Sequence, residues 1–178
     1  MPTIQERSSQ LENWLNEEGI PFNKLPEGSP QRFKDAILHI LVLLENIPIN
    51  IITTNGKLDK IIFSGGVNLN APQKQNLASM SDLERDKFMS LYEMGILQMQ
   101  LFASLQKQSS IEGLGAITWA YHGELNKTNF IDKLYSIKRA IMFISQILSQ
   151  LSPKSEQAQP VTKQNITPDS QNEIRGYG

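Results

Sequence analysis

The sequence predicts an α+β domain, because segments with helical periodicity alternate with segments typical of β-strands. The strongest strand signal is Asn55-Gly56, which lies between two β-rich runs and accepts the positive φ angles that tight hairpin turns require. The clearest helix start is Ser81 followed by Glu84, which has the spacing of a capping box. A third signal is the alternation of apolar and polar residues from Leu97 to Gln106, as in a half-buried strand. The elements therefore follow the order helix, strands, helix, strands, helix.

Length and composition limit the class of protein. The chain of 178 residues fits one domain, expected over residues 1–151, that can bury a core without disulfides. It has no cysteine, which excludes thiolate metal sites and is compatible with a reducing cytoplasm. With 17 basic and 18 acidic residues, it has no overall charge to attract nucleic acid or an anionic membrane. No segment is apolar enough for a membrane span or a secretion signal, so we expect a cytoplasmic protein.

The first half of the chain is expected to hold one helix and a group of strands. An amphipathic pattern predicts a helix over residues 3–18, which Gly19 and Pro21 end. The segment from Phe33 to Leu44 suits either a helix or a strand, and periodicity alone leaves this open. Strands are predicted near residues 49–54 and 57–69, with a bulge or bend at Gly65-Gly66 in the second.

The second half repeats the alternation. The capping box begins a helix that should end near Gly95, and the alternating segment at residues 97–106 should follow as a strand. A loop at residues 107–110 leads to a second strand over residues 111–121, completing a hairpin. Thr128 or Asn129 is a good N-cap for the last helix, which should continue to about Leu151.

The last helix carries the most regular apolar pattern in the chain, with spacings that average 3.5 residues, the period of a coiled-coil seam. Two interpretations remain open. The stripe packs on the sheet as core, or it forms the interface of a homodimer. The residues of this stripe are Phe130, Leu134, Ile137, Ile141, Ile144, Leu148 and Leu151.

After Leu151 the composition changes to Gln, Ser, Pro and charged residues, with too little apolar surface to offset the entropy of ordering the chain. Residues 152–178 are therefore predicted to be a disordered tail. A docking motif at residues 174–178 is an alternative to a purely solubilising tail.

The motif search predicts no catalytic, cofactor-binding or metal site. The chain has only His39 and His122, too few to build a typical zinc site with no cysteine available. His39 lies in an apolar run and is expected to be a core or edge histidine, whereas His122 is expected in a solvated turn. A carboxylate-based site would have to use scattered acids. The candidates are Asp59, Glu93, Glu112 and Glu124.

Several runs of core and capping residues resemble the YbjN-like family of small prokaryotic proteins, whose fold is like that of type III secretion chaperones. The similar segments are residues 49–52, 61–63, 67–69, 77–88 and 118–123, with Phe130 at the start of the last helix. The resemblance covers roughly residues 11–151 and carries no catalytic motif.

This resemblance implies an α-β-β-β-α-β-β-α order, with helices against a five-stranded antiparallel sheet. It therefore assigns the segment from Phe33 to Leu44 to a strand. It also implies a protein-binding module, often dimeric and without a cofactor. Our leading hypothesis is a chaperone-like or adaptor protein that binds another polypeptide through a sheet edge or an apolar groove. The alternatives are a small-molecule-binding protein or enzyme, and a structural subunit tethered by its tail.

Overall fold

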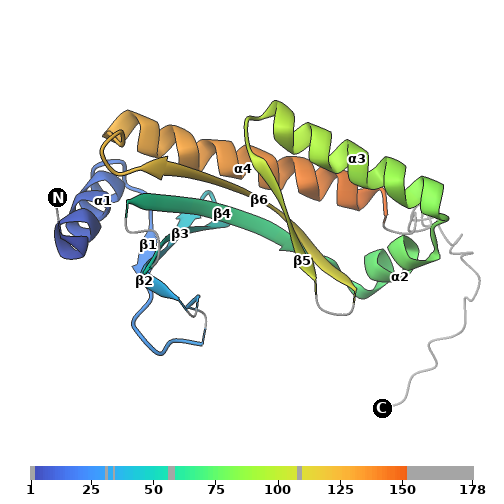
Figure 1. Cartoon of the computed structure of the whole chain (residues 1–178), viewed down its shortest axis with the longest axis horizontal. Coiled ribbons are helices and arrows are strands. Elements are labelled where there is room, and N and C mark those ends of the chain that lie inside the picture. Colours follow the sequence, from blue (N-terminus) through green and yellow to red (C-terminus); the bar gives the residue numbers. More distant parts are fainter. Residues whose placement is uncertain (1–2, 31, 34, 56–58, 108–109, 152–178) are drawn as a thin grey trace, which may run out of the picture.

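The computed structural model describes residues 3–30, 32–33, 35–55, 59–107 and 110–151, which form an α+β fold (Figure 1). Four helices and one antiparallel sheet make up this part of the chain. The helices are α1 (Ile4–Glu17), α2 (Ala71–Ser79), α3 (Asp82–Gln98) and α4 (Lys127–Ser149). The strands are β1 (Phe22–Lys24), β2 (Ala36–Leu44), β3 (Ile47–Thr54), β4 (Lys60–Asn68), β5 (Phe102–Lys107) and β6 (Ile111–Tyr121).

The sheet has six strands in the order β1-β2-β3-β4-β6-β5, so the expected number of five is wrong. The additional strand is β1, which places Phe22 opposite Val42 at one edge of the sheet. It has three residues, of which only Phe22 is apolar, and so carries no readable alternation. Helix α2 was also missed, although Asn70 and Gln73 form a capping box at its start.

The helices lie in layers around the sheet. Helix α4 packs on β4 and β6 across one face, and α3 lies beside it over β5 (Figure 1). Helices α1 and α2 lie at opposite ends of the sheet (Figure 1). Most of the buried apolar residues form one cluster between the sheet and the helices. A single chain therefore encloses a continuous core.

The strand assignment for the segment from Phe33 to Leu44 is confirmed by β2, which begins only at Ala36 and whose Leu38, Ile40 and Val42 face the core. A two-residue turn at Glu45 and Asn46 joins it to β3, and both residues have positive φ angles, 51° and 67°. The predicted hairpin of β3 and β4 is confirmed by their antiparallel pairing. The predicted turn at Asn55-Gly56 lies partly outside the described residues, because Gly56 is not among them.

The boundary between α3 and β5 differs from the prediction. Helix α3 continues past Gly95 to Gln98, and β5 begins only at Phe102, so the predicted strand over residues 97–106 is wrong in its first part. Ile96 is fully buried and holds the last turn of α3 against the core. Gln100 then takes a positive φ of 58°, which reverses the chain. Packing by Ile96 therefore extends the helix beyond the glycine.

Gly65 and Gly66 do not form a bulge. Their pairing with Ala116 and Gly115 continues without a shift in register. A Cβ atom on Gly65 would overlap the side chain of Ile141 in α4, so the glycine allows the helix to lie close to the sheet. A Cβ on Gly66 would lie 2.8 Å from the Leu114 carbonyl oxygen.

The last strand and the last helix agree with the prediction. Strand β6 covers residues 111–121, with Thr118 turned toward the core and Trp119 toward the open face. Helix α4 starts slightly earlier than expected, because Asn126 is its N-cap. The predicted disordered tail, residues 152–178, lies outside the described residues.

All seven residues of the apolar stripe are buried within the single chain, six of them on α4 and Leu151 just after it, with exposed fractions of 0–6%. The structure thus places the stripe in the core, where it contacts the sheet. A homodimer interface formed by α4 would have to use other side chains. The homodimer itself stays a prediction.

Candidate functional site

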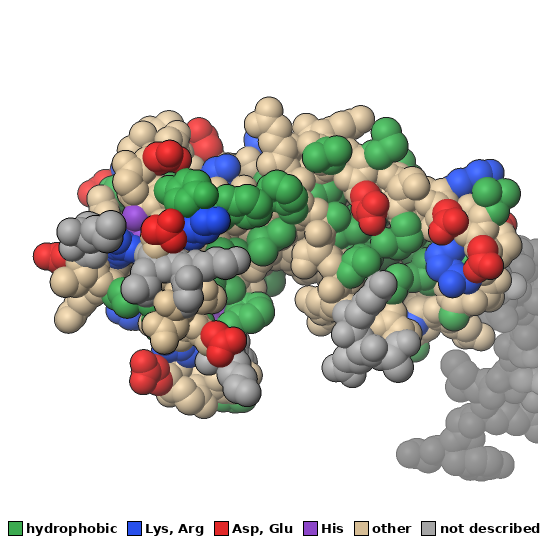
Figure 2. Space-filling view, in the orientation of Figure 1, with side chains coloured by type: hydrophobic (Ala, Val, Ile, Leu, Met, Phe, Trp, Pro, Cys, Tyr) green, Lys and Arg blue, Asp and Glu red, His purple; other side chains and the backbone are tan. Residues whose placement is uncertain are grey.

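A groove of about 880 Å³ lies between α2, α3 and the β5–β6 hairpin, and we call it the α2–α3 groove. Figure 2 shows its apolar side chains on the face below α3, with charged side chains of both signs around them. The apolar lining residues are Leu77, Ala78, Met89, Leu105 and Ile111. The polar lining residues are Lys74, Gln75, Arg85, Asp86, Glu93 and Ser110. A hollow of about 650 Å³ along α1 is lined by that helix alone and is therefore not enclosed by opposing elements.

The α2 wall is fixed to the end of α4 by two amide side chains. The Gln73 Nε2 group donates to the Leu148 carbonyl oxygen at 3.0 Å, and Asn76 Nδ2 donates to the Leu151 carbonyl oxygen. Both acceptors lie in the last turn of α4 or directly after it, where carbonyl groups lack the regular helical hydrogen bonds. Helix α2 is thus held where α4 ends, and Leu77 is buried beneath it.

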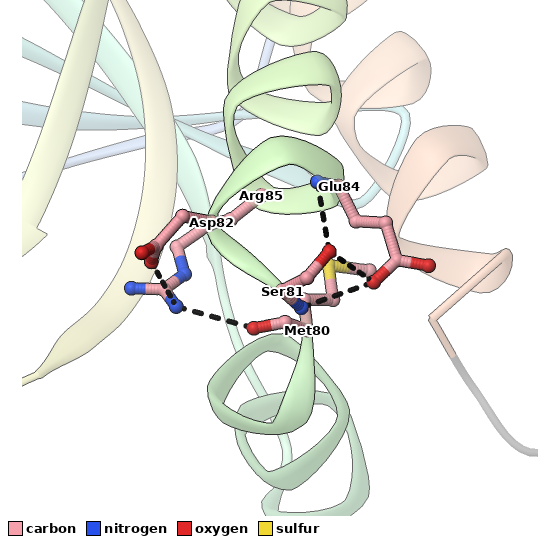
Figure 3. Close-up of polar contacts among 5 residues, drawn as sticks. All are labelled: Met80, Ser81, Asp82, Glu84 and Arg85. Atoms are coloured by element: carbon pink, nitrogen blue, oxygen red, sulfur yellow. Dashed lines mark hydrogen bonds and ion pairs between the residues drawn. The ribbon is translucent and has the colours of Figure 1, made fainter.

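The α3 wall begins at the predicted capping box, which is confirmed (Figure 3). The Glu84 amide donates to Ser81 Oγ at 3.3 Å, and the Ser81 amide donates to the Glu84 carboxylate at 3.0 Å. Hydrogen bonds from the side chain and backbone of Ser81 hold the pKa of Glu84 below its usual value. Glu84 therefore caps the helix and does not line the groove, whereas the next residue, Arg85, does.

Arg85 is oriented by its neighbours at the start of α3. Its Nη2 atom donates to the Met80 carbonyl oxygen and to Asp82 Oδ1, both at 3.2 Å (Figure 3). Its buried Nε has no hydrogen-bond partner among the described residues. The guanidinium is thus fixed at one end and keeps an unused donor. Sequence reasoning missed this residue, although the capping box locates it one position after Glu84.

The hairpin wall is anchored to α3 by Tyr92, whose side chain is fully buried. Its hydroxyl accepts from the Ser104 amide at 3.0 Å and from the Gly115 amide at 3.2 Å. It also lies within donating distance of the Ser104 and Gly115 carbonyl oxygens. Burial raises the pKa of Tyr92 above its usual value, so the hydroxyl stays protonated. The two walls of the groove are therefore held at a fixed separation.

The charges around the groove are only partly neutralised. Lys74 pairs with Glu112 at the edge of β6, and this bond lowers the pKa of Glu112. Asp86 and Glu93 line the groove on the α3 side and form no ion pair among the described residues. The groove therefore has an apolar surface, and on its α3 side two carboxylates that form no ion pair among the described residues.

The four candidate acids are not brought together. Glu93 lines the groove and Glu112 lies at the nearby start of β6, whereas Glu124 follows the other end of that strand. Asp59 is also at that far end, where its carbonyl oxygen accepts from the His122 amide at 2.8 Å. Among the residues that the structure describes, no three His, Asp or Glu side chains are placed to share a metal ion.

The two histidines occupy different environments. His39 is a buried core histidine, as expected, and its Nε2 lies 2.8 Å from Asn50 Oδ1. His122 is only partly exposed, so the expectation of a solvated turn residue needs correction. Burial, followed by the charge of Arg7, lowers the pKa of His122 to about 4. Its imidazole is therefore neutral near pH 7, and its buried Nε2 has no partner within the described residues.

A second exposed surface lies on the open face of the sheet. Phe102 and Trp119 stack with ring centroids 4.6 Å apart, and Lys60 Nζ lies 5.6 Å from the Trp119 centroid and 5.1 Å from that of Tyr121. These four residues form a small aromatic patch. The rings contact one another and Lys60. The patch therefore has fewer groups without a partner than the groove.

Comparisons with known proteins identify a family and a fold. No curated protein matches the chain. The structure is similar to the crystal structure of an uncharacterized protein from Methanothermobacter thermautotrophicus, with a TM-score of 0.67, 17% identity and coverage of 80% of this chain and 96% of that one. That similarity shows the fold alone. No helix within the described residues is long and apolar enough to cross a membrane. Residues 8–148 match a family described as "Uncharacterized conserved protein (DUF2299)", and the chain therefore belongs to this family.

Proposed function

We propose that the protein is a non-enzymatic polypeptide-binding module that holds an apolar segment of another protein in the α2–α3 groove. The observation that carries the proposal is the lining of the groove, where five apolar side chains lie between basic and acidic ones. An amphipathic peptide matches such a surface because apolar anchors supply affinity and charged pairs fix its orientation. The sequence resemblance to YbjN-like proteins and type III secretion chaperones supports a chaperone-like or adaptor role by analogy.

The geometry of the walls favours a preformed site. Tyr92 fixes α3 to the hairpin, and Gln73 fixes α2 to α4, so neither wall has to be ordered when a peptide binds. Binding to a preformed groove avoids much of the entropy cost that weakens flexible sites. We therefore expect the groove to accept short segments without a large rearrangement.

Small-molecule binding in the same groove is the second candidate. Its volume lies within the range of roughly 300–1,000 Å³ that is typical of ligand pockets. A ligand that binds only the folded state would raise the midpoint of thermal unfolding. A metabolite that raises this midpoint in the natural chain but not in a Met89→Asp variant would favour small-molecule binding over the peptide site.

Selection from a random peptide display library tests the proposed function. We expect enrichment of peptides with apolar anchors beside basic residues, and loss of binding in Met89→Asp, which places a third carboxylate in the lining. Leu91→Asp is the matched control, because it lies two positions away on α3 and points about 200° around the helix. Circular dichroism checks that both variants fold. Enrichment that is equal with Leu91→Asp and Met89→Asp would contradict the groove as the site.

A further inference from the structure

The described chain ends beside the α2–α3 groove. Leu151 is buried, and its carbonyl oxygen accepts a hydrogen bond from Asn76 in α2. Helix α2 supplies Lys74, Leu77 and Ala78 to the groove lining. The segment after Leu151 therefore starts at one wall of the site that we propose for polypeptides.

The length of this segment is sufficient for it to return to the groove. The chain from Ser152 to Ile174 would have an end-to-end distance of roughly 25–30 Å if it behaves as a flexible chain. This is comparable to the diameter of about 30–40 Å expected for a domain of this size. A segment tethered in this way has an effective concentration of about 1 mM near the groove.

The composition of the segment points to one stretch as the occupant. Ile174 and Tyr177 are two apolar residues within four positions, with Arg175 between them and Glu173 before them. Val161 and Ile166 are further apart and include no aromatic residue. The 173–177 stretch thus combines an acid, an aliphatic anchor, a cation and an aromatic anchor within a short length.

The groove has matching groups. Its apolar residues can receive Ile174 and Tyr177, and the unpaired Asp86 and Glu93 carboxylates can pair with Arg175. Arg85 lines the groove with a side chain that is 41% exposed, so its guanidinium can donate to the Glu173 carboxylate beside its existing bond to Asp82. Both signs of charge on the stretch therefore find their opposite in the groove lining.

We propose that residues 173–177 dock in the α2–α3 groove of the same chain and compete there with a partner's segment. The proposal rests on the proposed function, because it assigns the groove to polypeptides. It adds a regulatory element, since a partner must displace the tail before it binds. The apparent affinity for a partner falls in proportion to the time that the groove is occupied.

Limited trypsin digestion of the full chain tests this docking. The bond after Arg175 should be protected, whereas the bond after Lys163 serves as an internal reference. With an effective concentration of about 1 mM and a Kd of about 0.1 mM, cleavage at Arg175 should be about tenfold slower than in Ile174→Ser. Met89→Asp should also remove the protection, and Leu91→Asp should not. Mass spectrometry of early products gives both cleavage rates.

Each outcome decides the proposal. Equal cleavage at Arg175 in the natural chain and in Ile174→Ser would overturn it, and this tail substitution leaves the described domain unchanged. Protection that Ile174→Ser removes but a folded Met89→Asp variant retains would place the tail elsewhere and overturn the groove assignment. Protection that grows with protein concentration would assign the groove to the tail of a second copy.

The peptide selection separates this proposal from the proposed function. If both hold, selected peptides should bind Ile174→Ser about tenfold more tightly than the natural chain, by the same estimate of occupancy. If selected peptides bind the groove equally well in both chains, the docking proposal fails and the polypeptide site remains. If no peptide binds either chain but the bond after Arg175 is protected, and Met89→Asp removes this protection, the tail occupies the groove. The proposed function, binding of another polypeptide, then fails.

Discussion

Helices α3 and α4 lie side by side, but they bury their apolar residues to different extents (Figure 1). On α4, the whole apolar stripe is buried against the sheet. On α3, only Phe88, Tyr92 and Ile96 are buried, whereas Met94 and Leu97 are 60% and 68% exposed. The difference follows from position, because α4 crosses the middle of the sheet and α3 covers only its β5 edge.

The comparison teaches that an apolar residue on a helix does not by itself identify a core position. Helix α4 has opposing strands along its length, so the side chains of its core-facing stripe are buried, whereas Met142 on its outer side is 55% exposed. Helix α3 has α4 on one side and the groove on another, which leaves part of its apolar surface open. Exposed apolar surface of this kind is typical of interaction sites, and the groove that we propose as a binding site is lined by the same helix.

The largest expected effect is a charge placed beneath α4. Ile144→Asp buries an unpaired carboxylate at a fully buried position, so we expect a loss of about 4 kcal/mol or more in the free energy of unfolding. Leu97→Asp on α3 is the comparison and should change that free energy by only about 0.5 kcal/mol or less. Urea denaturation followed by circular dichroism measures both. Similar losses would show that α3 is buried as fully as α4.

A smaller effect is expected when α3 loses its polar anchor. Tyr92→Phe keeps the buried ring but removes the hydroxyl that bonds to Ser104 and Gly115, at a cost of about 1–1.5 kcal/mol. Urea denaturation gives the global cost, and hydrogen exchange at the Ser104 and Gly115 amides shows whether β5 opens locally. An unchanged exchange rate at both amides would argue against Tyr92 as the anchor of this wall.

The contact between the two helices can be tested at Gly95, where an added Cβ would overlap the Phe143 ring. Gly95→Ala should gain about 1 kcal/mol of helix propensity and lose about 1–3 kcal/mol to overpacking, for a net loss of about 1 kcal/mol. Phe143→Leu makes room, so the double variant should be more stable than the sum of the single changes predicts. A double-mutant cycle in urea measures this coupling, and a value near zero would contradict close packing at this point.

The smallest effect concerns pH. Because burial raises the pKa of Tyr92, its contribution to stability is fully present below the usual value of 10.0. It is lost as the pH rises through the higher pKa of the folded state, since the unfolded chain releases this proton first. The urea midpoint of the natural chain should therefore fall more steeply above pH 10 than that of Tyr92→Phe. The same pH dependence of the urea midpoint in both chains would contradict a raised pKa of Tyr92.

Local signals in the sequence predicted several elements well. The Ser81–Glu84 capping box, the strand over residues 111–121 and the long last helix all depend on residues close together in the chain. The missed elements, β1 and α2, are short, and their apolar residues are too few to show a period. Of the residues that line the groove, the sequence indicated only Glu93 as a candidate. The lining comes from three elements that lie apart in the chain, and no local sequence pattern links them.

The sequence by itself determined the α+β class, the caps and the amphipathic faces, because these arise from interactions within a few residues. Only the tertiary structure decided that α3 continues through Gly95, that Gly65 pairs without a bulge, and that the α4 stripe is core. Each of these results depends on a distant partner: the core that buries Ile96, the β6 residues opposite Gly65, and the strands beneath α4. Such contacts form between residues far apart in the chain, so periodicity and propensity carry no record of them.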